Sequence, residues 1–356
     1  MSPSGPLDGV TILEVGGVGP APFCGMVLAD LGADVISIGR PSADRPPDDI
    51  AVVTADILGR GRARRLVTDL KRPDGVAAVL ELVNTVDALV EGFRPGTMER
   101  LGLSPEACWN VNPRLVYGRM TGWGQTGPLA QQPGHDINYL ALSGALAAMG
   151  PKDGPPLPPL NLVADFGGGG MLLAAGVLAA LLRAERTGRG SVVDAAMSDG
   201  AALQMTMMYE LLGRGQWSLQ RESNINDGAA PFYRTYETAD GRHVAVGAME
   251  RTFWDALIDR LGLAREQLPD QWDRSAWPGL SARLAEVFRR RTRDEWAAEL
   301  EHAGVCVTPV LTMAEAPAHP HNVARNAFVR DTHGPVPAPA PRVHVHEAMH
   351  SEAADD

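Results

Sequence analysis

Short apolar stretches alternate with helical patterns along the first half of the chain. The apolar stretches lie at residues 10–15, 34–38, 66–70, 87–91 and 114–120. Helical patterns run through Met26, Val27 and Leu31 and over residues 74–86. Strands that alternate with helices of this length are typical of βαβ units, so the pattern predicts a parallel sheet. In such sheets, ligands bind outside the carboxyl ends of the strands.

The middle of the chain predicts three further helices. His135 opens the first, whose apolar residues recur at helical spacing until Gly150-Pro151 ends it. The second begins after the glycine run Gly167–Gly170 and continues through the apolar run Met171–Leu182. That run is shorter than the ~20 residues that span a bilayer, which favours a buried helix. A Met-rich helix over Leu203–Met208 follows.

The second half of the chain reads as a smaller α/β unit. Residues 232–237 and 243–247 flank Ala239-Asp240-Gly241, a strong β-hairpin signal. Helical patterns follow at residues 254–261, 280–289 and 293–302. From Pro309 onward Pro and His accumulate, which indicates an extended tail that returns to the first domain.

Length supports two domains, because single cores stop growing at roughly 250–300 residues and this chain has 356. The predicted organisation is a large domain over 1–200, a linker over 201–230, a small α/β domain over 231–308, and a segment over 309–356 that returns to the large domain. Both domains are of the α/β class.

Composition excludes several classes of protein. A net charge of −11 argues against a general nucleic-acid or membrane-surface binder, which would be basic. Three scattered cysteines without a CxxC motif indicate a reducing compartment. Residues 1–6 show neither the basic nor the apolar region of a secretory leader, so we expect a cytoplasmic protein.

The first turn, Gly16–Pro22, resembles a dinucleotide fingerprint but departs from it. Pro22 stands where that motif needs Gly or Ala, and the second strand ends at Arg40 where an acidic residue would hold the ribose. A tight structural turn without a nicotinamide cofactor is therefore predicted. Scattered C-terminal histidines lack a helical partner motif, so no metal site is expected.

Arginines concentrate in a short segment of this acidic chain, at Arg60, Arg62, Arg64 and Arg65. Such a run is usually a solvated loop. Because Arg40 and Arg94 each follow a predicted strand, and a guanidinium suits phosphate oxygens, a multiply phosphorylated small ligand is the alternative interpretation.

Two candidate proton-transfer groups stand in matching settings. His135 and Asp165 each lie where an irregular Gly/Pro segment gives way to a helix. A histidine and a carboxylate so placed could remove and return one proton on two faces of a carbon. The amide of Asp136, at a helix start, could stabilise the enolate oxygen. Each residue also has a structural interpretation, His135 as a packing residue and either aspartate as a helix N-cap.

Specific motifs give the chain a family resemblance. Residues 121–128, 134–139 and 161–165, with 31–35, 91–96 and 100–103, resemble the α-methylacyl-CoA racemases of the family III CoA-transferase superfamily. In the second half, residues 227–233, 238–241 and 246–250 resemble the small domain of the same enzymes. The similarity extends to about Arg342. One departure is Arg251, where family members often carry a proline.

The resemblance implies an interlocked homodimer with a Rossmann-like large domain and a small α/β domain. It implies a cofactor-free isomerase that interconverts (2R)- and (2S)-2-methylacyl-CoA, with His135 and Asp165 as acid and base. Glu250, which read alone is a surface carboxylate, would support the histidine. The implied substrate-binding residues are Arg40, Thr68, Gly92, Phe93, Arg94, Arg100, Gly134, His135, Asp136, Ile137, Asn138 and Tyr139.

Two rival functions remain open at this point. A CoA transferase of the same superfamily would use Asp165 as a nucleophile. A non-catalytic acyl-CoA binding protein is the other possibility. His135 separates these readings, because a transferase needs no second base there and a binding protein needs neither group.

Overall fold

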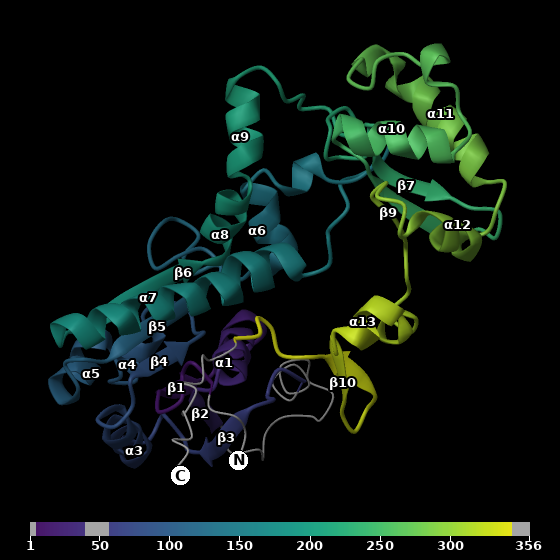
Figure 1. Cartoon of the computed structure of the whole chain (residues 1–356). Coiled ribbons are helices and arrows are strands. Elements are labelled where there is room, and N and C mark those ends of the chain that lie inside the picture. Colours follow the sequence, from purple (N-terminus) through teal and green to yellow (C-terminus); the bar gives the residue numbers. More distant parts are fainter. Residues whose placement is uncertain (1–4, 40–56, 344–356) are drawn as a thin grey trace, which may run out of the picture. The chain divides into compact units, whose positions relative to one another are not determined.

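The computed structural model describes residues 5–39 and 57–343, so Arg40, His344, His346 and His350 lie outside the described part. The chain forms two compact units (Figure 1). The first comprises Met1–Ala145, Pro159–Thr206 and Pro339–Asp356. The second comprises Leu146–Pro158 and Met207–Ala338.

A six-stranded sheet forms the centre of the first unit. The strands are β1 (Thr11–Val15), β2 (Asp34–Gly39), β3 (Arg62–Val67), β4 (Ala88–Glu91), β5 (Val116–Thr121) and β6 (Ser191–Ala196). They follow the order β3-β2-β1-β4-β5-β6, and every pair is parallel. This is the strand order of dinucleotide-binding folds. Successive strands are added on one side of β1 up to β3 and on its other side from β4 onward, so the order reverses between β1 and β4. The predicted parallel sheet is confirmed, although β6 was not predicted.

The prediction for β3 is wrong, because the arginine run forms the strand itself rather than a loop before it. β3 is an edge strand of the sheet, and its apolar residues Leu66 and Val67 are exposed at its end. The apolar residues therefore did not indicate where the strand is centred. Arg62 is largely buried, and its Nη2 donates to Glu14 Oε2 (2.5 Å) and to the Pro22 carbonyl (2.7 Å). Arg60 donates to Asp30 (2.5 Å). These two arginines therefore form ion pairs within the chain, with Asp30 and Glu14.

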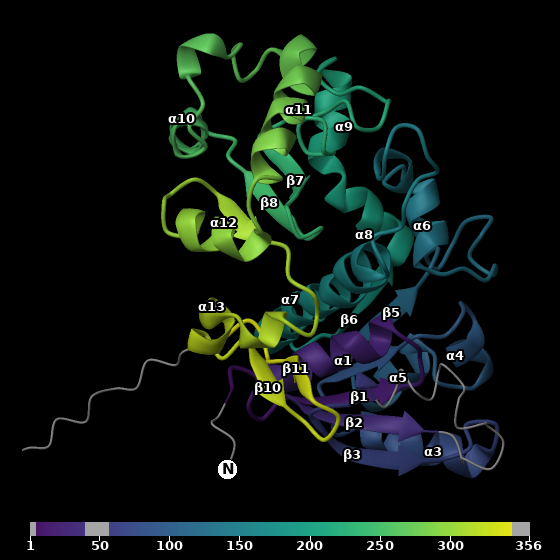
Figure 2. The same ribbon diagram turned by 90° about the vertical axis from the view of Figure 1, so that its right-hand side faces the viewer.

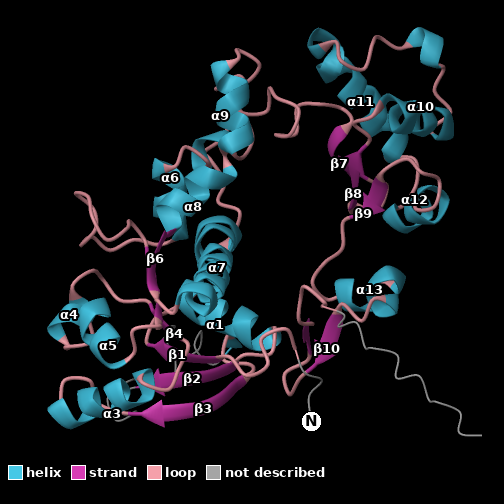
Figure 3. Ribbon diagram, turned by 60° about the vertical axis from the view of Figure 1, so that its left-hand side comes forward, coloured by secondary structure: helices cyan, strands magenta, loops and turns pink. Residues whose placement is uncertain are grey.

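Helices cover both faces of the sheet (Figure 3). Leu13 and Val15 of β1 lie in one core cluster with residues of α3 (Pro73–Val83), α4 (Thr97–Arg100) and α5 (Pro105–Val111). Side chains alternate along a strand, so the opposite face of the sheet is left for α1 (Pro20–Asp30) and α7 (Leu172–Thr187). Gly118 of β5 makes room there for Leu173 and Val177.

The helix that carries Asp165 starts earlier than predicted. A π-helix, η3 (Leu162–Met171), contains the whole glycine run and continues directly into α7. The glycines permit close packing: a Cβ on Gly168 would lie 2.7 Å from the Gly200 carbonyl carbon, and one on Gly170 would lie 2.7 Å from the Pro20 oxygen. The run thus places η3 against α1 and α8 (Met197–Gln204) rather than breaking the helix.

The combined helix Leu162–Thr187 is long and apolar enough to cross a membrane. The length argument made from Met171–Leu182 is therefore wrong. Length and composition alone are weak evidence of a membrane span, and one side of α7 packs on β5 and β6. The helix thus belongs to the α/β core.

Of two helical predictions in the middle of the chain, the one that begins at His135 was too long, and the one over Leu203–Met208 is interrupted. α6 covers Asp136–Leu142, and Gly144, at φ 81°, separates it from a 3₁₀ turn, η2 (Leu146–Ala148). The Met-rich pattern is divided between α8 and α9 (Thr206–Gly213), with Met205 between them.

The second unit contains an antiparallel sheet (Figure 2). β7 (Tyr233–Glu237) and β8 (His243–Gly247) form the predicted hairpin, and β9 (Val307–Pro309), which was not predicted, pairs with β8. The helices are α10 (Arg251–Arg260), α11 (Trp277–Phe288) and α12 (Arg293–Leu300), with 3₁₀ turns η4 (Arg265–Gln267) and η5 (Arg274–Ala276). Aromatic side chains form its core, including Phe232 directly before β7 and Trp254, Trp277, Phe288 and Trp296 of the helices.

The segment after Pro309 is more structured than an extended tail. It holds η6 (Ala316–Ala318), α13 (Pro320–Ala324) and a two-stranded antiparallel sheet of β10 (Phe328–Arg330) and β11 (Pro335–Pro337). Its many prolines are compatible with such short elements.

The Gly168–Gly200 contact should be essential for stability. Gly200→Ala would drive a methyl group into the Gly168 carbonyl, so we expect a loss of about 1–3 kcal/mol in the free energy of unfolding. Gly213→Ala, at the end of α9 where an added Cβ meets no atom within 4 Å, is the matched control and should be neutral or slightly stabilising. Thermal unfolding measures both, and equal melting temperatures would contradict the packing argument.

Candidate functional site

The carboxyl edge of the parallel sheet gathers three glycine-containing turns, after β1, β4 and β5. The first two touch at the point where the strand order reverses. A Cβ on Gly92 would lie 2.9 Å from the Cα of Gly17, and the ring of Phe93 occupies the space beside Gly16. The first turn therefore serves close packing.

A buried carboxylate fixes the turn after β4. Glu91 is fully buried; its Oε2 accepts from the Phe93 amide (2.7 Å) and its Oε1 accepts from Arg119 Nε (2.9 Å). Arg119 also donates to Glu99 of α4 (2.8 Å). Burial raises the pKa of Glu91, while the Phe93 amide and Arg119 oppose this. The network holds Gly92, Phe93 and Arg94 in place.

Asp165 lies in the first turn of η3, half-buried and facing the turn after β1. A Cβ on Gly19 would lie 3.9 Å from its Oδ2. The pKa of Asp165 is raised to about 6, mainly by burial and secondly by the charge of Asp136. A hydrogen bond from the Asn161 side chain and the charge of His135 act in the opposite direction. A carboxyl with this pKa can both accept and release a proton near neutral pH.

Asp136 caps η3, not the helix that it begins. Its Oδ2 accepts from the amides of Ala164 (2.8 Å) and Asp165 (2.9 Å), and only 5% of the residue is exposed. The N-cap of α6 is His135, whose amide donates to Asn138 Oδ1 (3.0 Å). One residue of α6 therefore ties the beginning of two helices together.

His135, Tyr139 and Arg94 surround this pair of aspartates. His135 is exposed. The Tyr139 ring packs edge-on to Trp123 (centroids 4.7 Å apart) and fills the space beside Gly122 and Gly134. The pKa of Tyr139 is raised to about 12, mainly by burial and secondly by the Asp165 charge, while Arg94 opposes the shift. Arg94 and Asp165 thus both lie close enough to Tyr139 to act on the pKa of its hydroxyl.

The remaining candidates are distributed as follows. Thr68 follows β3, and its amide donates to Gly39 (3.1 Å). Arg100 is exposed and donates to Thr97 Oγ1 (2.9 Å). Ile137 and Asn138 are exposed on α6. Glu250 is the N-cap of α10 and belongs to the second unit.

Sequence reasoning missed Glu91 and Arg119 as functional residues, and it missed the side-chain role of Asn161. Glu91 is hidden at the end of an apolar strand. Asn161 lies four residues before Asp165, a spacing at which helical side chains meet, so it could have been found.

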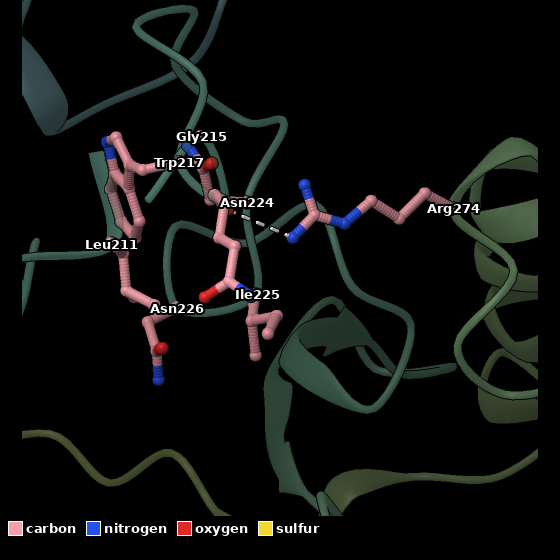
Figure 4. A pocket seen from close by; sticks show the side chains of 8 residues that line it. Leu211, Gly215, Trp217, Asn224, Ile225, Asn226 and Arg274 are labelled. Atoms are coloured by element: carbon pink, nitrogen blue, oxygen red, sulfur yellow. Dashed lines mark hydrogen bonds between the residues drawn. The ribbon is translucent and has the colours of Figure 1, made fainter. Parts of the chain in front are cut away.

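No cluster of metal-ligating side chains occurs within 5–39 and 57–343. A cavity of about 450 Å³ in the second unit contains none of the predicted site residues (Figure 4). It is lined by Leu211, Gly215, Gln216, Trp217, Asn224, Ile225, Asn226 and Arg274, and Arg274 donates to the Gln216 carbonyl (3.3 Å). It offers no acid or base for the chemistry above.

Comparison with known proteins assigns the family. The family model described as CoA-transferase family III matches residues 7–354. The chain belongs to this family. It is 44% identical over 336 residues to the alpha-methylacyl-CoA racemases of Mus musculus and Homo sapiens, which covers 94% of this chain and 86% of each relative.

Other members of family III are also similar. The acetyl-CoA:oxalate CoA-transferase of Acetobacter aceti is 34% identical over 342 residues, covering 92% of this chain and 86% of the relative. Among solved structures, a CAIB/BAIF family protein from Brucella suis superposes with a TM-score of 0.79 at 27% identity, covering 96% of this chain and 93% of the other. The mixed α/β fold with its parallel sheet is thus confirmed.

Asp165 should make this family III protein less stable at neutral pH. Its folded-state pKa of about 6 exceeds the unfolded value of about 3.9, so its ionised form is disfavoured by folding. Above pH 6, Asp165→Asn should therefore be more stable than wild type by roughly 1 kcal/mol, a value discounted for solvent screening.

This gain should shrink as the pH falls from 6 to 4, because Asp165 of the wild type then becomes protonated in the folded state. Melting temperatures across this range measure it. Asp199→Asn, at an exposed aspartate of α8, is the control variant. A pH-independent gain for Asp165→Asn would contradict the assigned environment.

Proposed function

We propose that the chain is a racemase of 2-methylacyl-CoA thioesters. The observation that carries the proposal is the convergence of His135 with Asp165, whose pKa of about 6 suits both proton removal and proton delivery. The full-length similarity to alpha-methylacyl-CoA racemases supports the same substrate class.

The proposed reaction is a proton exchange at C2. One of His135 and Asp165 removes the α-proton, and the other delivers a proton to the opposite face. The Asp136 amide, at the start of α6, donates to the enolate oxygen, where the helix dipole favours negative charge. Glu250 supports the histidine, and no further cofactor takes part.

The CoA moiety provides binding energy that orients the acyl group. Arg94 is the best-supported contact of those expected, because it is exposed, lies close enough to Tyr139 to act on its pKa, and has its turn fixed by Glu91. Thr68, directly after β3, and Arg100, at the end of α4, are proposed to bind the remote part of CoA. Arg40 belongs to the same proposal but lies outside the described residues.

A homodimer is the proposed assembly. Five large apolar side chains are 44–75% exposed on α6, α8 and the start of η3, which pack together: Ile137, Leu142, Leu160, Leu162 and Leu203. Large exposed apolar side chains on elements that pack together support an interaction site, and the partner copy would cover them.

Deuterium exchange tests the reaction. A single epimer of a 2-methylacyl-CoA incubated with the enzyme in D₂O should acquire deuterium at C2 and yield both epimers. The doubly substituted His135→Ala, Asp165→Ala protein, checked for folding by circular dichroism, serves as the blank. Transfer of CoA to an added carboxylate without exchange at C2 would instead assign a transferase, as in the Acetobacter aceti relative.

A further inference from the structure

The Asp136 side chain has no role in the proposed chemistry, yet it is among the most constrained polar groups of the first unit. It is 5% exposed, and one oxygen, Oδ2, receives both the Ala164 and the Asp165 amides. The other oxygen, Oδ1, is buried without a hydrogen-bond partner. Burial of a carboxylate with one unpaired oxygen destabilises the fold. We therefore expect Asp136 to have a role that an apolar residue could not fill.

We infer that the Asp136 side chain is a positioning residue that sets both the place and the proton affinity of Asp165. This inference rests on the proposed function, in which Asp165 is a catalytic acid and base. Its two hydrogen bonds join the start of η3 to the start of α6. Asp136 thereby fixes two groups relative to each other. One is its own backbone amide, proposed to bind the enolate oxygen, and the other is the Asp165 carboxylate that moves the proton.

The charge of Asp136 acts on Asp165 with little competition. Of the described residues, His135 is the other charged group that acts on Asp165, and it acts in the opposite sense. The parts of α1 and α8 that pack on η3 present Pro20, Phe23, Gly200 and Gln204 to it, and the ionisable residue of α8, Asp199, is exposed. Tyr139 and Arg94 lie on the remaining side. A like charge next to a half-buried carboxyl disfavours its ionisation, which keeps Asp165 able to carry a proton near neutral pH.

Asp136→Asn separates charge from shape, since the amide keeps an oxygen that can accept from Ala164 and Asp165. The carbon-13 carboxyl signal of Asp165, assigned with Asp165→Asn, should titrate roughly one unit lower in Asp136→Asn than in wild type. For the epimer from which Asp165 removes the proton, the low-pH limb of kcat/KM for C2 exchange should move down in parallel, with KM for the CoA thioester unchanged. Asp199→Asn should alter neither readout.

Asp136→Ser, which keeps an uncharged oxygen in a smaller side chain, repeats the test if the asparagine variant does not fold. An unchanged midpoint for Asp165 in the folded variant would overturn the inference. So would a uniform loss of kcat without a shift of the low-pH limb, which is what a purely structural role gives. The titration needs no turnover, so an absence of C2 exchange in wild type would count against the proposed function alone.

Discussion

The position of Asp165 depends on a contact between two helical backbones. Gly168 of η3 and Gly200 of α8 approach so closely that neither tolerates a Cβ, and Gly170 meets α1 in the same way. π-Helical turns are rare and concentrate at functional sites. Here the turn brings the carboxylate to the carboxyl edge of the sheet, opposite Gly19.

The site combines reactivity with a cost in stability. Asp165 is half-buried and lies next to the buried Asp136, an arrangement that opposes ionisation. Groups whose pKa is shifted towards neutrality are typical of catalytic sites, and the rest of the fold must stabilise them. The surrounding scaffold does so with internal hydrogen bonds. Asp136 fixes two helices, and Glu91 with Arg119 fixes the turn that carries Arg94.

The sequence predicted those features that depend on local patterns. Apolar runs located β1, β2, β4, β5 and the β7–β8 hairpin, and the position of His135 and Asp165 near helix starts brought them together as a pair. Features that depend on tertiary contact were misread. The glycine run suggested a break, because glycine has a low helix propensity. The sequence pattern could not show that α1 and α8 pack closely against this run. The arginines of β3 suggested a solvated loop, because a run of charged residues usually lies in water. The ion pair of Arg62 with Glu14, which forms only after folding, could not be predicted from this run.

Epimer-specific exchange in two single variants tests the two-base account most directly. His135→Ala and Asp165→Ala should each lose racemisation of both epimers, because every turnover needs one group as base and the other as acid. Each variant should still exchange the α-proton of the one epimer that faces its surviving base. Deuterium wash-in into separate (2R) and (2S) substrates should therefore give mirror-image residual exchange. Undiminished racemisation in either variant would contradict the account.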